Sequence, residues 1–231
     1  MTGRRRIAVV TTSRADYGHL KWLLHDLRAH PDVELRTVAF GPHLSPEFGR
    51  TVEEIERDGF VVDEAIESLL SSDTDVGMAK SLGLATLGLA DAFARLRPQV
   101  VVITADRYEM LAAASVALTL RIPIAHIEGG DRSEGAIDDA VRNALTKLSH
   151  LHFTTTETAR RRVIAMGEEP WRVHRVGALS LDQLTRGTLP DPTGVAALLG
   201  VVPGRRLFVV GCHPETLQPD TTAWLDEMMR A

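Results

Sequence analysis

Short apolar runs alternate with helix-like periods along most of the chain, and this alternation restricts the fold more than any other feature. Residues 7–12 form an apolar run that is typical of a buried strand. Leucines then recur at positions 20, 23, 24 and 27, the spacing of an amphipathic helix. The same pattern predicts further strands at 35–40, 60–62, 99–104, 122–127, 152–155, 173–176 and 207–210, and further helices at 46–58, 75–97, 107–120, 136–148, 157–166 and 221–230.

Alternating strands and helices favour a doubly wound α/β fold built on a parallel, Rossmann-like sheet. We expect residues 1–184 to form one such N-terminal domain. Residues 185–204 contain three prolines and four glycines, which indicates a linker. Residues 205–231 then look like the first strand and helix of a second Rossmann-like domain.

Charge and cysteine content limit the classes of function. The chain of 231 residues carries 26 Lys and Arg against 31 Asp and Glu, and this acidic balance disfavours binding to nucleic acid. The run at positions 4–6 is basic, but the apolar stretch after it is too short for a signal peptide or a membrane span. The single cysteine, Cys212, cannot form an intrachain disulfide, so we expect a cytoplasmic protein without membrane contact.

Ligands of doubly wound sheets bind at the carboxyl ends of the strands, so the residues after each strand are the candidates. Arg14 follows the first strand at the start of a helix, where backbone N–H groups favour an anion. The alternative is a surface arginine beside a helix capped by Ser13. His43 follows the second strand, where it either bonds a ligand or, more commonly, serves the structure.

Asp106 and Arg107 follow the most strand-like segment of the chain. A carboxylate beside an arginine at this place suits a phosphate-bearing ligand. Glu109 lies three residues after Asp106, and this spacing is also typical of a helix-capping box. The two interpretations are compatible.

The stretch from Glu128 to Asp138 is the most informative part of the sequence. Gly129 and Gly130 lack side chains and can let the backbone approach a ligand closely. Glu128 and Asp138 add carboxylates to the same crevice, and carboxylates that converge can serve as general acid and base. Asp138 is also typical of a helix start, with Arg142 as its i,i+4 partner. The spacing of acids and histidines matches no metal site.

Several of these motifs recur, in order, in one known family. The chain resembles the hydrolysing UDP-N-acetylglucosamine 2-epimerases, most closely their sialic-acid branch. The motifs are Arg14-Ala15-Asp16-Tyr17, Asp106-Arg107, His126-Ile127-Glu128-Gly129-Gly130, Glu134-Gly135-Ala136-Ile137-Asp138-Asp139, Arg142, Thr146-Lys147 and His213-Pro214. The resemblance covers essentially the whole chain. It implies a two-domain glycosyltransferase-B-like fold, of which this chain has the first domain and a truncated second.

The resemblance also implies an activity: conversion of UDP-N-acetylglucosamine to N-acetylmannosamine and UDP, without a cofactor or metal. Asp106, Glu128 and Asp138 would share the acid and base roles, in an assignment that stays open. Substrate binding would fall to Arg14, His43, Arg107, Gly129, Gly130 and His213. The family usually has glycine where this chain has Ala105.

Three alternatives remain beside this hypothesis. The substrate could be UDP-diacetylbacillosamine. The chain could be an inactive or split-enzyme fragment that only binds nucleotide sugar or a partner chain supplying the second domain; otherwise we expect a homo-oligomer. A glycosyltransferase half is the third, and the carboxylates Glu128 and Asp138 argue against it.

Overall fold

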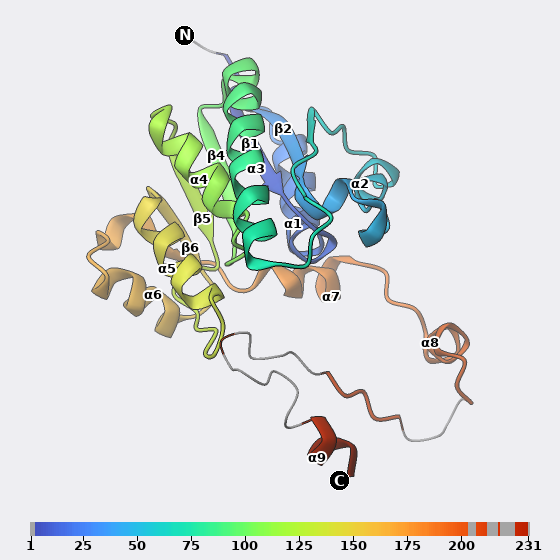
Figure 1. Ribbon diagram of the computed structural model, residues 1–231. Helices are drawn as coiled ribbons and strands as arrows, with labels where there is room; N and C mark the ends of the chain where they lie inside the picture. Colours follow the sequence, from blue (N-terminus) through green and yellow to red (C-terminus); the bar gives the residue numbers. More distant parts are fainter. Residues whose placement is uncertain (1–2, 203–206, 212–216, 218–224, 231) are drawn as a thin grey trace.

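A parallel sheet of seven strands forms the centre of the molecule (Figure 1). The computed structural model describes residues 3–202, 207–211, 217 and 225–230. The strand order is β3-β2-β1-β4-β5-β6-β7, the doubly wound arrangement that the sequence predicts. The strands are β1 (Arg5–Thr11), β2 (Val33–Phe40), β3 (Glu64–Ile66), β4 (Val100–Thr104), β5 (Ile124–Ile127), β6 (Leu151–Thr154) and β7 (Val173–Arg175).

Helices cover both faces of the sheet. The main ones are α1 (Arg14–Ala29), α2 (Val52–Arg57), α3 (Asp75–Leu96), α4 (Met110–Thr119), α5 (Asp138–Leu148) and α6 (Glu157–Ala165). Later helices are α7 (Asp182–Arg186), α8 (Pro192–Leu199) and α9 (Leu225–Arg230), and short 3₁₀ turns are η1 (Gly41–Leu44), η2 (Pro46–Phe48), η3 (Pro170–Arg172) and η4 (Leu179–Leu181).

Two apolar cores result from the alternation of side chains along the strands. On one face, Val101 and Ile103 of β4 pack with residues of α3, α4 and α5, including Leu89 and Leu145. On the other face, Val102 packs with α1 and α2 in a second cluster. Figure 1 shows α3 and α4 in front of the sheet and α1 behind it.

The third strand lies later than the sequence pattern indicates. Phe60 is buried in the core below α1, but residues 60–62 form no strand, and β3 begins at Glu64. The preceding Asp63 accepts the backbone N–H of Thr37 at 2.8 Å and pairs with Arg36 at 2.7 Å. The apolar run at 60–62 therefore reflects burial of a loop residue. The predicted helix at 46–58 is likewise divided into η2 and α2.

The chain returns to α1 after leaving the sheet at β7. Arg186 of α7 forms two hydrogen bonds with Asp26, at 2.8 and 2.6 Å, and lies 4.6 Å above the ring of Trp22. Trp22 also donates to Gln183 at 3.1 Å. Beyond this contact, α8 and α9 lie apart from the sheet (Figure 1). Residues 207–211 are exposed and belong to no strand, so the strand expected at 207–210 is not formed.

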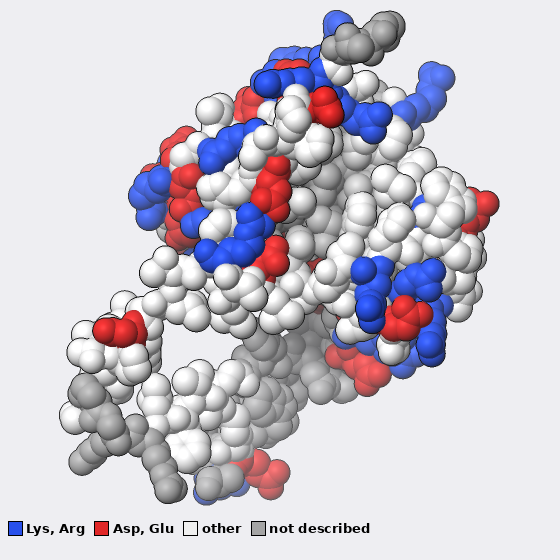
Figure 2. All heavy atoms as spheres, turned by 180° about the vertical axis from the view of Figure 1, so that it is seen from behind, with Lys and Arg blue, Asp and Glu red and all other residues white. Residues whose placement is uncertain are grey.

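The surface carries no extended region of one charge on the face in Figure 2, where acidic and basic side chains are interspersed. Many form local pairs, such as Arg95 with Glu64 at 2.7 Å. Among the described residues, no helix has the length and apolarity needed to cross a bilayer.

Candidate active site

The strands β4 and β5 end in residues with a left-handed backbone. Ala105 follows β4 with φ of 56°, and Glu128 follows β5 with φ of 66°. Both residues extend the ladder by one bond: Ala105 N–H donates to Ile127 O at 2.9 Å, and Glu128 N–H donates to Phe153 O at 2.8 Å. A left-handed backbone costs a residue with a side chain roughly 1–2 kcal/mol, and such strain gathers at functional sites. Two of the five described non-glycine residues with positive φ therefore lie at the carboxyl ends of adjacent strands.

Asp106 lies beside the first of these turns and joins β4 to α5. Its carboxylate accepts the hydroxyl of Ser133 at 3.1 Å and forms an ion pair with Arg142. The structure corrects two expectations here. Asp106 does not cap α4, which begins at Met110. Arg142 pairs with Asp106 rather than with Asp138.

Glu128 faces His19, a residue of α1 that the sequence analysis did not select. The distance from His19 Nδ1 to Glu128 Oε1 is 3.4 Å. Glu128 raises the pKa of His19 above its ordinary value, and the negative charges of Asp16 and Asp106 act in the same direction. His19 therefore marks the point where these carboxylates converge. The sequence holds only a local signal: His19 lies three residues after Asp16 and so shares its helix face, which does not indicate the contact with Glu128.

Arg107 extends from the β4–α4 loop and remains one-third exposed. Its Nη2 donates to Glu109 Oε1 at 2.6 Å, and the Glu109 side chain is only 5% exposed. The structure therefore places a buried carboxylate against an arginine whose side chain remains partly exposed. Arg14 lies at the first position of α1, is largely exposed and contacts Glu54 at 3.4 Å.

His43 lies inside the protein rather than on an open wall. Its Nε2 is 2.9 Å from Thr11 Oγ1, and its Nδ1 is 2.8 Å from Thr51 Oγ1. Burial lowers the pKa of His43, so the ring is neutral at physiological pH. With both nitrogens in use, this arrangement is that of a structural histidine, the common alternative for such a loop.

Gly129 and Gly130 are required by packing inside the protein. A side chain at Gly129 would lie 3.0 Å from Thr146 Oγ1 and 3.1 Å from His126 Nδ1. A side chain at Gly130 would collide with the carbonyl of Ala159 on α6, and its φ is 84°. The glycines thus let the loop after β5 pass between the sheet and two helices.

His126 explains part of this requirement. The Nε2–H of its buried ring donates to the carbonyl of Ala105 at 2.9 Å. Its Nδ1 lies 3.3 Å from Thr146 Oγ1 on α5. Burial lowers the pKa of His126 to about 4, so the ring stays neutral. The left-handed turn before Asp106 is therefore held from β5.

Asp138 is the first residue of α5 and lies one helical turn before Arg142. Within the described part of the chain, its carboxylate has no hydrogen-bond partner, whereas Asp139 accepts from Ser133 N–H and from Asn143 Nδ2, each at 3.3 Å. Asp138 is thus the free carboxylate on the helix that carries the partner of Asp106.

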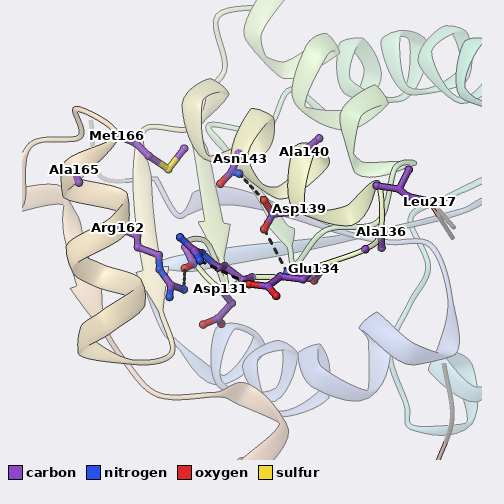
Figure 3. Close-up of a pocket in the computed structure, with 14 residues that line it drawn as sticks. Asp131, Glu134, Ala136, Asp139, Ala140, Asn143, Arg162, Ala165, Met166 and Leu217 are labelled. Carbon is purple, nitrogen blue, oxygen red and sulfur yellow. Dashed lines mark hydrogen bonds and ion pairs between the residues drawn. The ribbon is translucent and has the colours of Figure 1, made fainter. Parts of the chain in front are cut away.

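A cavity of about 790 Å³ lies between the loop at residues 130–136, α5 and α6 (Figure 3). Arg162 reaches across it to donate to Gly130 O at 3.1 Å. Among the predicted site residues that the structure describes, only Gly130 lines this cavity. Ser133 connects its wall to Asp106. The cavity therefore adjoins the carboxylate edge without containing it.

Two further expectations from the sequence concern His213 and a metal site. His213 lies outside the described residues. Over the ranges that the structure describes, no three His, Cys, Asp or Glu residues are grouped closely enough to hold a metal ion.

The fold and this edge define a Rossmann-like α/β protein with carboxylates gathered at the ends of its central strands. The family model described as UDP-N-acetylglucosamine 2-epimerase matches residues 25–231, and the chain belongs to this family.

Two of the relatives that this chain resembles match nearly all of its length. The chain is 38% identical over 219 residues to the GDP/UDP-N,N'-diacetylbacillosamine 2-epimerase (hydrolyzing) of Campylobacter jejuni. This match covers 95% of this chain and 57% of the relative. It is 34% identical over 215 residues to the UDP-N-acetylglucosamine 2-epimerase of Neisseria meningitidis, with coverage of 93% and 55%. The chain therefore spans a little over half the length of these relatives.

The solved structures agree on the fold. The structure of the Neisseria meningitidis UDP-GlcNAc 2-epimerase bound to UDP-GlcNAc matches with a TM-score of 0.70 and 18% identity, over 78% of this chain and 48% of that chain. The UDP-GlcNAc 2-epimerase of Methanocaldococcus jannaschii in complex with UDP-GlcNAc and UDP gives a TM-score of 0.65 at 21% identity, over 75% and 46%.

Proposed function

We propose that this chain carries the proton-transferring half of a hydrolysing 2-epimerase that converts UDP-N-acetylglucosamine to N-acetylmannosamine and UDP. The observation that carries the proposal is the pair Asp106 and Glu128, placed at the ends of adjacent strands by the left-handed turns at Ala105 and Glu128. Membership of the family supports the reaction class. The name of the Neisseria relative supports this substrate.

The reaction needs two proton transfers at one carbon. A base removes the C2 proton, the C1–O bond breaks, and its electron pair leaves with the diphosphate of UDP. Water then adds across the new C1–C2 double bond, with oxygen at C1 and a proton delivered to the opposite face of C2. Asp106, Glu128 and Asp138 are the carboxylates that we propose for these transfers. The proton removed from C2 passes to water, and the proton delivered to C2 comes from water.

The leaving diphosphate needs cationic donors, because negative charge grows on its oxygen as the bond breaks. Arg107 is the cation best placed for this role, since it lies beside Asp106 and stays one-third exposed. Arg14 sits at the start of α1, where the backbone N–H groups of the first turn also favour an anion. We propose that both bind the diphosphate, together with His213.

A second substrate deserves the same assay. Two of the relatives, from Campylobacter jejuni and Legionella pneumophila, are named as 2-epimerases of diacetylbacillosamine nucleotides, at 38% and 37% identity. UDP-N,N'-diacetylbacillosamine is therefore the alternative substrate. Its sugar differs from N-acetylglucosamine at C4 and C6, so the proposed chemistry at C1 and C2 is unchanged.

The test offers each sugar nucleotide to the purified full chain and follows UDP release, with deuterium incorporation at C2 in D₂O as a second readout. We expect release to fall at least about 100-fold in Asp106→Asn and in Asp138→Asn, the scale typical of a lost acid or base. Asp139→Asn is the matched control and should change the rate less than about threefold.

The outcomes separate the hypotheses. Absence of both UDP release and UDP binding by folded protein would refute the proposal for this chain. Binding without turnover supports a split enzyme whose other half comes from a partner chain. Turnover with a sedimentation mass of two or more chains supports the homo-oligomer.

A further inference from the structure

Glu109 is a buried acid without an evident structural task. Its side chain is 5% exposed at the position before α4, yet it does not cap that helix. One oxygen, Oε1, accepts from Arg107 Nη2 at 2.6 Å. The other, Oε2, is buried without a hydrogen-bond partner among the described residues, and so is Arg107 Nε. Leaving buried polar atoms unpaired costs roughly 1–3 kcal/mol each, so their presence at this place needs an explanation.

The surroundings of the pair confine Glu109 but leave Arg107 open. Gly41, after β2, has φ of 63°, and a side chain there would lie 4.0 Å from both Glu109 Cγ and Ser68 Oγ. Arg107, by contrast, is 33% exposed. The negative charge of Asp16 also acts on Arg107. The pair therefore joins a buried acid to an arginine that follows β4 and keeps part of its side chain exposed.

A guanidinium on a flexible side chain loses rotamer freedom when it binds an anion, and a partner that fixes it beforehand reduces that cost. We propose that Glu109 is a positioning residue that fixes the guanidinium of Arg107 for the diphosphate of the nucleotide sugar. This inference rests on the proposed function. Glu109 acts through Arg107 and itself touches no ligand.

The carboxylate also has an opposing effect. Its negative charge reduces the attraction of Arg107 for an anion, while its hydrogen bond fixes the orientation of the Arg107 guanidinium. Glu109→Gln separates the two effects, because the amide oxygen still accepts from Arg107 but carries no charge. Glu109→Ala removes both. If the hydrogen bond positions Arg107, Glu109→Gln should retain the UDP affinity that Glu109→Ala loses.

The experiment measures UDP binding by calorimetry to the full chain. We expect Glu109→Ala to weaken UDP binding about tenfold and Glu109→Gln to stay within about threefold of the natural protein. In an Arg107→Ala background, Glu109→Ala should have no further effect on UDP binding. Equal losses in both backgrounds, or equal losses in Ala and Gln, would overturn the proposal, since a general structural role produces them.

A second measurement does not depend on the nucleotide. The Arg107 Nε–Hε signal in ¹H–¹⁵N spectra, assigned by its loss in Arg107→Ala, should show restricted motion in the natural protein and in Glu109→Gln. It should become mobile in Glu109→Ala. If the natural chain binds no UDP, the proposed function fails for this chain while this measurement still decides whether Glu109 fixes Arg107. An Arg107 side chain equally mobile in all three proteins would refute the positioning role.

Discussion

Asp106 and Arg142 form an ion pair that connects the end of β4 to the second turn of α5. Both side chains are largely buried, at 18% and 9% exposure. The pair links two segments that the sequence separates by 36 positions. It thereby brings the predicted acids Asp106 and Asp138 to the same end of one helix.

Breaking this pair on one side should destabilise the fold. Arg142→Met leaves the buried Asp106 carboxylate without its cation, and we expect a loss of about 3 kcal/mol in the free energy of unfolding. Urea titration measures this loss. Arg161→Met on the exposed face of α6 should change stability by less than about 0.5 kcal/mol, because Arg161 is 78% exposed. Adding Asp106→Asn to Arg142→Met should recover part of the loss, and strictly additive effects would contradict the pairing.

Ala105→Gly should stabilise the protein. The left-handed turn costs alanine roughly 1–2 kcal/mol, and glycine adopts it freely. The greater freedom of glycine in the unfolded chain removes roughly 0.4–1 kcal/mol of that gain, so we expect a net increase near 0.5–1 kcal/mol. Thermal unfolding should shift upward by about 1–4 °C. Ala94→Gly on the exposed face of α3 is the control and should lower stability by about 1 kcal/mol.

Gly129 and Gly18 should respond in opposite directions to alanine. Gly129→Ala places a methyl group 3.0 Å from Thr146 Oγ1 and 3.1 Å from His126 Nδ1, so we expect a loss of about 1–3 kcal/mol. Gly18 lies on the exposed face of α1 with nothing near its missing side chain, and Gly18→Ala should gain about 1 kcal/mol. Denaturant unfolding of the two variants tests both. A neutral Gly129→Ala would show that the loop after β5 can shift.

His126 should make the fold sensitive to acid. Burial lowers its pKa to about 4 from an unfolded value near 6.5, so the unfolded chain binds this proton first as pH falls. The contribution of neutral His126 is therefore complete above pH 6.5 and is lost between pH 6.5 and 4, by up to about 3 kcal/mol. His126→Gln should show a smaller decline in unfolding free energy over that window. An identical decline in both proteins would mean that other groups carry it.

Much of the fold followed from the sequence, because the central strands β1 and β4 contain apolar runs that lie between helical periods. The apolar run at 60–62 misled, since Phe60 is buried from a loop while the ladder begins at Glu64. The site was harder to predict. Asp106 and Glu109 have the spacing of a capping box, yet their bonds go to Arg142 and Arg107, one of them far along the chain.

His19 illustrates the remaining difficulty. Its contact with Glu128 joins α1 to the end of β5, and no local pattern records which strand lies beside a helix. The structure explains why this chain can have alanine at position 105, where the family usually has glycine. Glycine suits the left-handed backbone at this position, and the alanine tolerates it because His126 and Ile127 hold both sides of its peptide.

The backbone turns at Ala105 and Glu128 also affect the thermodynamics of binding. Because the ladder bonds and His126 fix these turns, the entropy of ordering this backbone is spent during folding. A ligand that reaches this edge then meets a preorganised surface, and its affinity is not reduced by the closure of a loop. Binding of a ligand at Asp106 and Glu128 should accordingly proceed in one kinetic phase, without a slow rearrangement after encounter.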